Sequence, residues 1–252
     1  MKRTVVVPDL QVPYHDPIAV KNVAAYIKAV RPDSVVTLGD EIDLPQISRW
    51  TENTPGWYEQ TLATDRDEAV EVLWSLVEHA KDAHMIRSNH TDRLYNVIMK
   101  KIPAFLALPE LRFEKFMKLD ELGITYHKKP YAIARGIVAV HGDEQSVKPT
   151  PGLTALEAAR RHGISVICGH THRAGQSAFT EASGGRIGRI LRGWEAGHLM
   201  DVRQAHYTKG TMNWQQAFII IEEIGTNVQV SLINLEKDGT FIVAGKRYGR
   251  SR

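Results

Sequence analysis

Hydrophobic runs alternate with amphipathic stretches along the first half of the chain. Residues 3–7 and 34–38 are apolar and rich in β-branched side chains, a pattern typical of buried strands. Between them, Asp16-Pro17 marks a helix start, and apolar residues at helical spacing extend this helix to about Val30. A second apolar stripe, over residues 69–80, predicts a longer helix. The first half therefore predicts strands and helices in alternation.

The second half is richer in predicted strands. Residues 91–120 have a helical pattern that Pro103 and Pro109 interrupt, and a further helix over residues 151–162 is ended by Gly163. Short strands are predicted at residues 124–126, 131–134, 137–140, 215–222 and 227–235. This order predicts an α/β protein in which two sheets pack together and helices cover the outside.

Length and composition are those of an ordinary globular protein. The chain has 252 residues, 43% of them hydrophobic and 24% charged, which is enough to bury a substantial core. No interior linker divides it, so we expect one domain over residues 1–252, with a flexible tail at 246–252. No apolar run approaches the roughly 20 residues of a membrane span, and the N-terminal run is too short for a signal peptide. We therefore expect a cytoplasmic protein without a membrane partner; the sequence does not predict its oligomeric state.

Cysteine and charge exclude some classes of protein. The single cysteine, Cys168, rules out an internal disulfide and a cysteine-rich zinc finger, and its apolar neighbours predict a buried, unreactive thiol. The net charge of +3 is too small to indicate a nucleic-acid partner by itself.

Five hydrophobic runs end in the same way, with Asp, Asn or His. In chain order the motifs are Asp9-Leu10-Gln11, Gly39-Asp40, Ser88-Asn89-His90, His141-Gly142 and Gly169-His170-Thr171-His172. Strands that end side by side would deliver these side chains along one edge of a sheet. Taken singly, each motif has a simpler explanation: His141, for example, could be a core histidine and Asp40 a helix cap. Five in order favour a metal site.

In this order the motifs resemble the metallophosphoesterase (calcineurin-like phosphoesterase) superfamily. Its pattern is Asp-x-His, Gly-Asp, Gly-Asn-His, His and Gly-His-x-His, and the resemblance covers residues 4–175. It implies a four-layer α-β-β-α sandwich of two mixed sheets with flanking helices, and a centre with two divalent ions. The compact length is also similar to that of stand-alone members from bacteria and their phages.

The resemblance implies a role for each motif residue. Asp9, Gln11 and His172 would hold the first ion, Asp40 would bridge both, and Asn89, His141 and His170 would hold the second. A hydroxide between the ions would attack the phosphate, because bound metal lowers the pKa of water. His90 would contact the phosphate, where it would stabilise charge or protonate the leaving oxygen.

Three positions differ from the family pattern or leave alternatives open. Gln11 stands where the family has histidine; its neutral amide oxygen predicts weaker binding and a preference for manganese, with zinc, iron or nickel as alternatives. His15 could supply the imidazole instead. Ser88 replaces a glycine. Arg93, three residues after His90, either clamps a phosphate oxygen or forms a surface ion pair.

The sequence favours hydrolysis of a phosphodiester in a nucleic acid or nucleotide, that is, a nuclease or phosphodiesterase. The motivation is a loop with Trp50 and Trp57, which could stack on bases or only cover the core, and two basic clusters. The clusters are Arg186, Arg189 and Arg192, and Lys246, Arg247, Arg250 and Arg252. Two alternatives remain: a phosphomonoesterase acting on DNA ends or small metabolites, and a non-catalytic binding protein whose site has decayed. Leu44-Pro45 follows Asp43, where protein serine/threonine phosphatases have Arg-Gly, which argues against that class.

Overall fold

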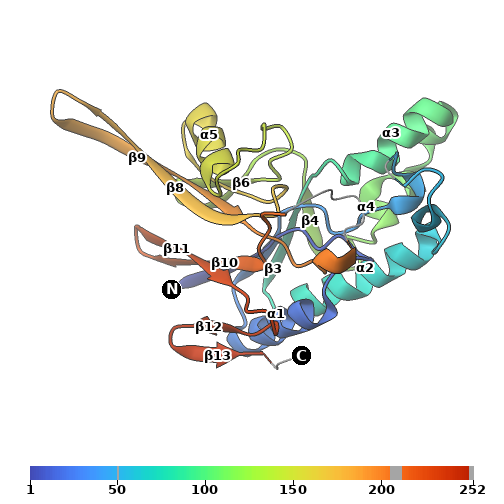
Figure 1. The fold of residues 1–252 in the computed structure, drawn as a ribbon, viewed down its shortest axis with the longest axis horizontal. Helices are drawn as coiled ribbons and strands as arrows, with labels where there is room; N and C mark the ends of the chain where they lie inside the picture. Colours follow the sequence, from blue (N-terminus) through green and yellow to red (C-terminus); the bar gives the residue numbers. More distant parts are fainter. Residues whose placement is uncertain (50, 205–211, 250–252) are drawn as a thin grey trace.

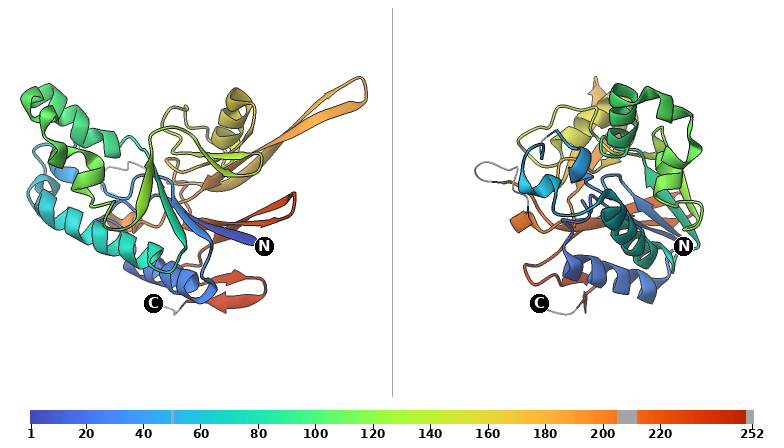
Figure 2. Two further views of the ribbon diagram at one scale, coloured as in Figure 1. Left: turned by 180° about the vertical axis from the view of Figure 1, so that it is seen from behind. Right: turned by 90° about the vertical axis from the view of Figure 1, so that its right-hand side faces the viewer.

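The computed structural model describes residues 1–49, 51–204 and 212–249. Two mixed β-sheets pack face to face, and helices cover their outer faces (Figure 1). Helix α5 (Leu153–His162) lies on one outer face, and α1 (Pro17–Val30) and α2 (Leu62–Val77) lie on the other (Figures 1 and 2). This is the α-β-β-α sandwich that the motif resemblance implied, and the predicted fold class is confirmed.

The first sheet has six strands in the order β11-β10-β1-β2-β3-β4. Strands β1 to β4 are parallel, while β10 and β11 run antiparallel to their neighbours. The bounds are β1 (Lys2–Val7), β2 (Ser34–Thr37), β3 (Asp82–Ile86), β4 (Ile124–His127), β10 (Ala217–Ile224) and β11 (Asn227–Asn234). The parallel strands therefore all end at the same side of the molecule.

The second sheet has five strands in the order β5-β6-β7-β9-β8. Strands β6, β7 and β9 are parallel, and β5 and β8 pair antiparallel at the two edges. The bounds are β5 (Tyr131–Ala134), β6 (Ile137–Val140), β7 (Ser165–Cys168), β8 (Ala174–Ser183) and β9 (Arg186–Ala196). The end of β8, the start of β9 and the turn between them project beyond the sandwich as a two-stranded ribbon (Figure 1).

Helix starts and stops follow local chemistry. Asp16 caps α1 by accepting the backbone N–H groups of Ile18 and Ala19 at 3.0 and 3.2 Å, as its sequence predicted. Helix α5 starts two residues later than predicted and ends at Gly163, which has the left-handed φ of 68°.

The predicted breaks in residues 91–120 are also present, because each proline opens a new short helix. Pro103 opens η3 (Pro103–Ala107) and Pro109 opens η4 (Pro109–Leu111). Helix α3 (Thr91–Lys101) precedes them and α4 (Phe113–Phe116) follows. Three further single-turn helices lie in loops: η1 (Pro45–Ile47), η2 (Pro55–Trp57) and η5 (Val202–Gln204).

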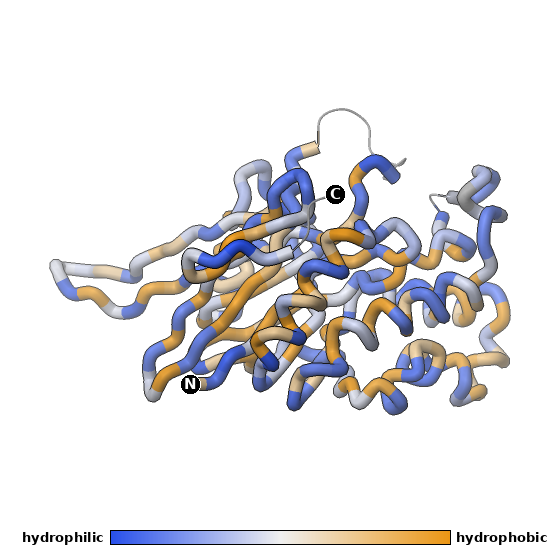
Figure 3. Tube along the Cα trace, turned by 90° about the horizontal axis from the view of Figure 1, so that it is seen from below, coloured by the Kyte–Doolittle hydropathy of each residue, from blue (hydrophilic) through white to orange (hydrophobic). Residues whose placement is uncertain are grey.

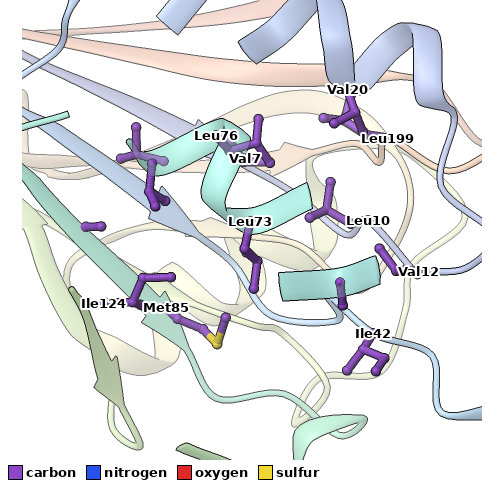
Figure 4. Close-up of a cluster of buried hydrophobic side chains, with 14 of the residues drawn as sticks. Val7, Leu10, Val12, Val20, Ile42, Leu73, Leu76, Met85, Ile124 and Leu199 are labelled. Carbon is purple, nitrogen blue, oxygen red and sulfur yellow. The ribbon is translucent and has the colours of Figure 1, made fainter. Parts of the chain in front are cut away.

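Apolar side chains fill the spaces between the layers. Hydrophobic stretches run along the central strands, whereas the helices mix hydrophobic and hydrophilic residues (Figure 3). Between the first sheet and α2, Val7 and Met85 of the sheet pack near Leu73 and Leu76 of the helix (Figure 4). A second cluster lies between the sheets and a third under α5, where Cys168 is buried as predicted. Burial raises the pKa of this thiol well above its ordinary value, which keeps it unreactive.

The C-terminal segment forms a small hairpin beside α1. Strand β12 (Phe241–Val243) pairs with β13 (Lys246–Tyr248), and the rings of Phe241 and Tyr248 contact Tyr26. The tail expected to be flexible thus begins with a strand, and residues 250–252 lie outside the described residues. No helix in the described part of the chain is long and apolar enough to cross a membrane.

Candidate metal centre

All five motifs follow the carboxyl ends of strands that point the same way. Asp9 follows β1, Asp40 follows β2 and Asn89 follows β3 in the first sheet, while His141 and His170 follow β6 and β7 in the second. The site therefore lies where the ends of two packed sheets meet. The sequence predicted that one sheet edge would carry all five motifs, whereas in the structure the edges of two sheets carry them.

The four residues predicted to surround the second ion lie together. Asp40, His141 and His170 each offer a ligand atom, and these three atoms lie within 4.8 Å of one another. Asn89 Oδ1 lies 2.9 Å from His141 Nε2. This arrangement brings one carboxylate, one amide and two imidazoles to a single point, a donor set suited to a divalent ion.

The residues predicted for the first ion lie on the other side of Asp40. His172 Nε2 is 3.1 Å from Asp9 Oδ2. The Gln11 amide nitrogen lies 3.1 Å from Asp40 Oδ2 and 3.4 Å from His172 Nε2. His15, the alternative to Gln11, instead has its Nδ1 atom 3.7 Å from Glu68 Oε1 on α2.

Four of these residues have left-handed backbones although none is glycine. The φ angles are 56° at Gln11, 55° at Asp40, 63° at His170 and 56° at His172. Such conformations cost energy for residues with a β-carbon and persist only where surrounding contacts hold them. Their concentration at this point is typical of a functional site.

Two glycines allow the motifs to approach this closely. A β-carbon at Gly39 would lie 2.5 Å from Ser88 Cβ and 2.8 Å from His141 Nδ1, and one at Gly169 would collide with Asp9 Oδ1. Ser88, which replaces the family's glycine, has an ordinary backbone and accepts the Asp40 N–H at 3.1 Å. The serine thus supports the loop that carries Asp40.

The environment of His141 shows why a cation fits here. His141 Nδ1 lies 2.8 Å from the Leu38 carbonyl oxygen and must donate to it. The other ring nitrogen then faces two oxygens, Asn89 Oδ1 at 2.9 Å and Asp40 Oδ1 at 3.3 Å. A lone pair facing two oxygens is unfavourable unless a proton or a metal ion lies between them. The Gln11 Oε1 atom is likewise buried and has no hydrogen-bond partner.

The pKa values of His141 and Asp40 also indicate that a positive charge is stable here. Burial disfavours the charged ring, but the Asp40 carboxylate outweighs it and raises the pKa of His141 to about 10. Burial likewise opposes charge on Asp40, yet His141 and His90 hold the pKa of that carboxyl well below its usual range. In the metal-free protein a proton on His141 therefore takes the place of a cation.

This proton predicts a pH dependence of the metal-free protein. The folded-state pKa of His141 lies above its ordinary value of 6.5, so its stabilising contribution is complete below about pH 6.5 and is lost towards pH 10. The pKa of His170 is lowered by burial and by His141, so its effect falls below this window. We expect the melting temperature in excess chelator to fall between pH 7 and 10, and less steeply in His141→Gln. Equal slopes in the two proteins would contradict the assignment.

His90 lies beside the centre, between the carboxylate of Asp43 and the guanidinium of Arg93. Its Nδ1 atom is 3.3 Å from Asp43 Oδ1, and its Nε2 atom is 3.7 Å from Asp40 Oδ2 and 2.9 Å from an Arg93 nitrogen. Arg93 also donates to the Asp43 carbonyl oxygen, so it is not an exposed surface ion pair. Burial raises the pKa of Asp43, although His90 and Arg93 act in the opposite direction.

Several residues near the centre carried no clear signal in the sequence. Glu41 is fully buried after Asp40, accepts the Gly39 N–H at 3.1 Å, and burial raises its pKa to about 7. Asp143 pairs at 2.8 Å with Arg87. Buried Glu195 on β9 bonds to the Thr171 hydroxyl at 2.9 Å; an acid inside an otherwise apolar strand end was the one available clue.

A layer of aromatic rings lies behind His172. His198 is fully buried, with its ring centre 5.6 Å from that of His172. The Trp214 ring is 4.5 Å from His172 on an edge-to-face contact. Of the tryptophans noted in the sequence, Trp57 donates to the Gln46 carbonyl within its own loop, and Trp50 lies outside the described residues.

The basic cluster on β9 begins at the far end of the β8-β9 ribbon and continues towards the sandwich. Strand β8 leaves the centre after His172 and runs for ten residues, roughly 30 Å, before Ser183 pairs with Arg186. Arg189 is paired with Glu181 at 2.6 Å. In the other cluster Arg247 pairs with Asp238 at 3.0 Å, while Arg250 and Arg252 lie outside the described residues. Of these clusters, Arg186 therefore lies at the far end of the ribbon, and Arg189 and Arg247 are paired with carboxylates.

Comparisons with known proteins agree on the fold. No protein-family model matches the chain. Two relatives are the Gene 54 proteins of Mycobacterium phages D29 and L5, each 33% identical to this chain. The alignments span 97% of this chain and 97% and 98% of those proteins. Vacuolar protein sorting 29 from Cryptosporidium parvum is similar in structure, with a TM-score of 0.50 and 15% identity over 99% of this chain and 98% of its own. That protein has the calcineurin-like metallophosphoesterase fold, which agrees with the fold the motifs implied.

Proposed function

The chain belongs to the Gene 54 protein family of mycobacteriophages, and we propose that it hydrolyses phosphate diesters with the help of divalent metal ions. The observation that supports this most is the convergence of Asp40, His141 and His170 within 4.8 Å, with His90 beside them. Clustered metal ligands next to a non-ligand imidazole suit metal-assisted attack on a phosphate.

In this proposal the centre holds two ions. The residues that would bind them are Asp9, Gln11, Asp40, Asn89, His141, His170 and His172, with Asp40 shared. When bound, the ions would supply hydroxide near neutral pH and neutralise charge on the phosphate. The amide oxygens of Gln11 and Asn89 are hard, neutral ligands, which favours manganese over zinc.

His90 and Arg93 would act on the phosphate. Arg93 donates to His90 Nε2 at 2.9 Å, and a guanidinium has no acceptor, so Nε2 carries no proton in this arrangement. The Asp43 carboxylate lies 3.3 Å from Nδ1, where it would stabilise a charged ring. A phosphate oxygen that attracts Arg93 would free Nε2 to carry a proton towards the leaving oxygen. The two residues would thus exchange partners when substrate binds.

Charge near the centre favours a diester over a monoester. Asp9, Asp40 and Asp43 are buried acids, and Arg93 is the guanidinium beside His90. A phosphomonoester carries close to two negative charges at neutral pH, whereas a diester carries one. Bound ions would offset the charges of Asp9 and Asp40. A diester would then need one further positive charge, which the Arg93 guanidinium supplies, whereas a monoester would bring a second negative charge towards Asp43. Nucleotides and nucleic acids are the diesters we propose as substrates.

Hydrolysis of bis(p-nitrophenyl) phosphate tests this proposal. Metal-stripped protein should be inactive and should regain turnover with manganese more than with zinc. It should also cleave the diester faster than p-nitrophenyl phosphate. Faster cleavage of the monoester would favour a phosphomonoesterase. Metal binding without turnover of either ester would favour a binding protein that has lost catalysis.

A further inference from the structure

Glu195, near the end of β9, links helix α5 to the loop after β7. It is fully buried. One carboxylate oxygen accepts the backbone N–H groups of Thr154 and Ala155 at 2.9 and 3.4 Å, and the other accepts the Thr171 hydroxyl at 2.9 Å. Both oxygens therefore act as acceptors, one towards helix α5 and one towards the loop after β7.

Helix α5 explains why a buried acid is stable at this position. The residue before the helix is Gly152, which has no side chain to cap the first turn. Glu195 supplies the missing acceptor from strand β9, and the positive end of the α5 dipole stabilises the negative charge of its carboxylate. The acid is thus fixed by the helix and presents its second oxygen in a defined direction.

The loop that Glu195 contacts is the one that needs support. Thr171 lies between His170 and His172, whose left-handed φ angles are 63° and 56°. The Thr171 hydroxyl donates to Glu195 and accepts the Arg173 N–H at 3.2 Å, so both of its bonds have a fixed direction. A strained loop of this kind keeps its shape only while such contacts hold it.

We propose that Glu195 is a positioning residue that, through the Thr171 hydroxyl, keeps His170 and His172 directed at the metal centre. This inference rests on the proposed function in taking both histidines as metal ligands. Outer contacts of this kind commonly change metal affinity by about 10–100-fold when they are removed. Glu195 itself is not a ligand and would not touch the substrate.

Manganese affinity of metal-stripped protein, measured by calorimetry, tests the proposal. Thr171→Val removes the hydroxyl at constant shape and should weaken manganese binding about 10–100-fold. Thr171→Ser keeps the hydroxyl and should remain within about threefold of the unmodified protein. Glu195→Gln puts an amide NH₂ group in place of one acceptor and should weaken binding in the same direction. Thr180→Val, the same change at an exposed position on β8, serves as the control.

A purely structural role makes a different prediction. If Glu195 only capped α5, Glu195→Gln would lower the melting temperature while the folded protein kept its manganese affinity. That result, or unchanged affinity in Thr171→Val, would overturn the proposal. Failure of the proposed function is a separate outcome: the unmodified protein would bind manganese, the variants would bind it more weakly, and no ester would be cleaved. An unmodified protein that bound no manganese would overturn both.

Discussion

Asp40→Asn is expected to abolish cleavage of bis(p-nitrophenyl) phosphate, lowering kcat/KM at least about a thousandfold, or about 4 kcal/mol of transition-state stabilisation. Asp40 lies between both groups of ligands: its oxygens are 3.1 Å from Gln11 Nε2 and 3.3 Å from His141 Nε2. Asparagine keeps the shape but removes the negative charge that both ions would share. The substitution therefore weakens both halves of the centre.

Metal content separates this explanation from simple unfolding. Calorimetry with manganese should show fewer bound ions in Asp40→Asn, while the far-ultraviolet circular dichroism stays that of the unmodified protein. Asp120→Asn is the matched control, because Asp120 is an exposed partner of Lys115 on the surface. Full activity in Asp40→Asn would show that the metal mechanism is wrong.

The sequence predicted the fold, and it pointed to residues that the structure brings together, because both depend on local patterns. Hydrophobic runs specify the strands, and the residue that ends each run is the one delivered to the sheet edge. Asp9, Asn89 and His141 could be identified in this way because each lies within three residues of the end of a run. The helix start at Asp16 and the helix end at Gly163 could also be predicted, since caps act within a few residues of the helix end.

Contacts between distant strands left no such pattern. Glu195 meets Thr171 and Thr154 only because β9 lies beside β7 and under α5. The left-handed backbones of His170 and His172 are also consequences of packing, since sequence preferences disfavour them. The pairing of Arg93 with His90 requires the first turn of α3, which sequence spacing permitted but did not specify.

Charge clusters were the least reliable guide. Arg186, Arg189 and Arg192 suggested a phosphate-binding surface, but β9 begins at Arg186 in the part of the ribbon that projects beyond the sandwich (Figure 1), and Arg189 pairs with Glu181. A cluster in sequence has meaning for a site only once the direction of its strand is known. The case for a diester now depends on Arg93 and Asp43, which lie beside His90.

His90→Ala is expected to lower kcat about 10²–10⁴-fold while leaving manganese affinity unchanged, because in the proposed mechanism His90 would contact the phosphate rather than an ion. The size of the loss should depend on the leaving group. A nitrophenolate leaves readily without a proton, whereas the alkoxide released from a dinucleotide needs one. If His90 Nε2 delivers that proton, the variant should lose more activity on a dinucleotide than on bis(p-nitrophenyl) phosphate.

Equal losses on the two substrates would assign His90 to charge stabilisation instead of proton transfer, which the contact of Nε2 with Arg93 would then explain. His162→Ala is the control, because His162 is exposed at the end of α5 and should keep full activity. Unchanged kcat in His90→Ala on both substrates would contradict the assignment altogether. In that event Arg93, freed from His90, would be the remaining group positioned to bind the phosphate.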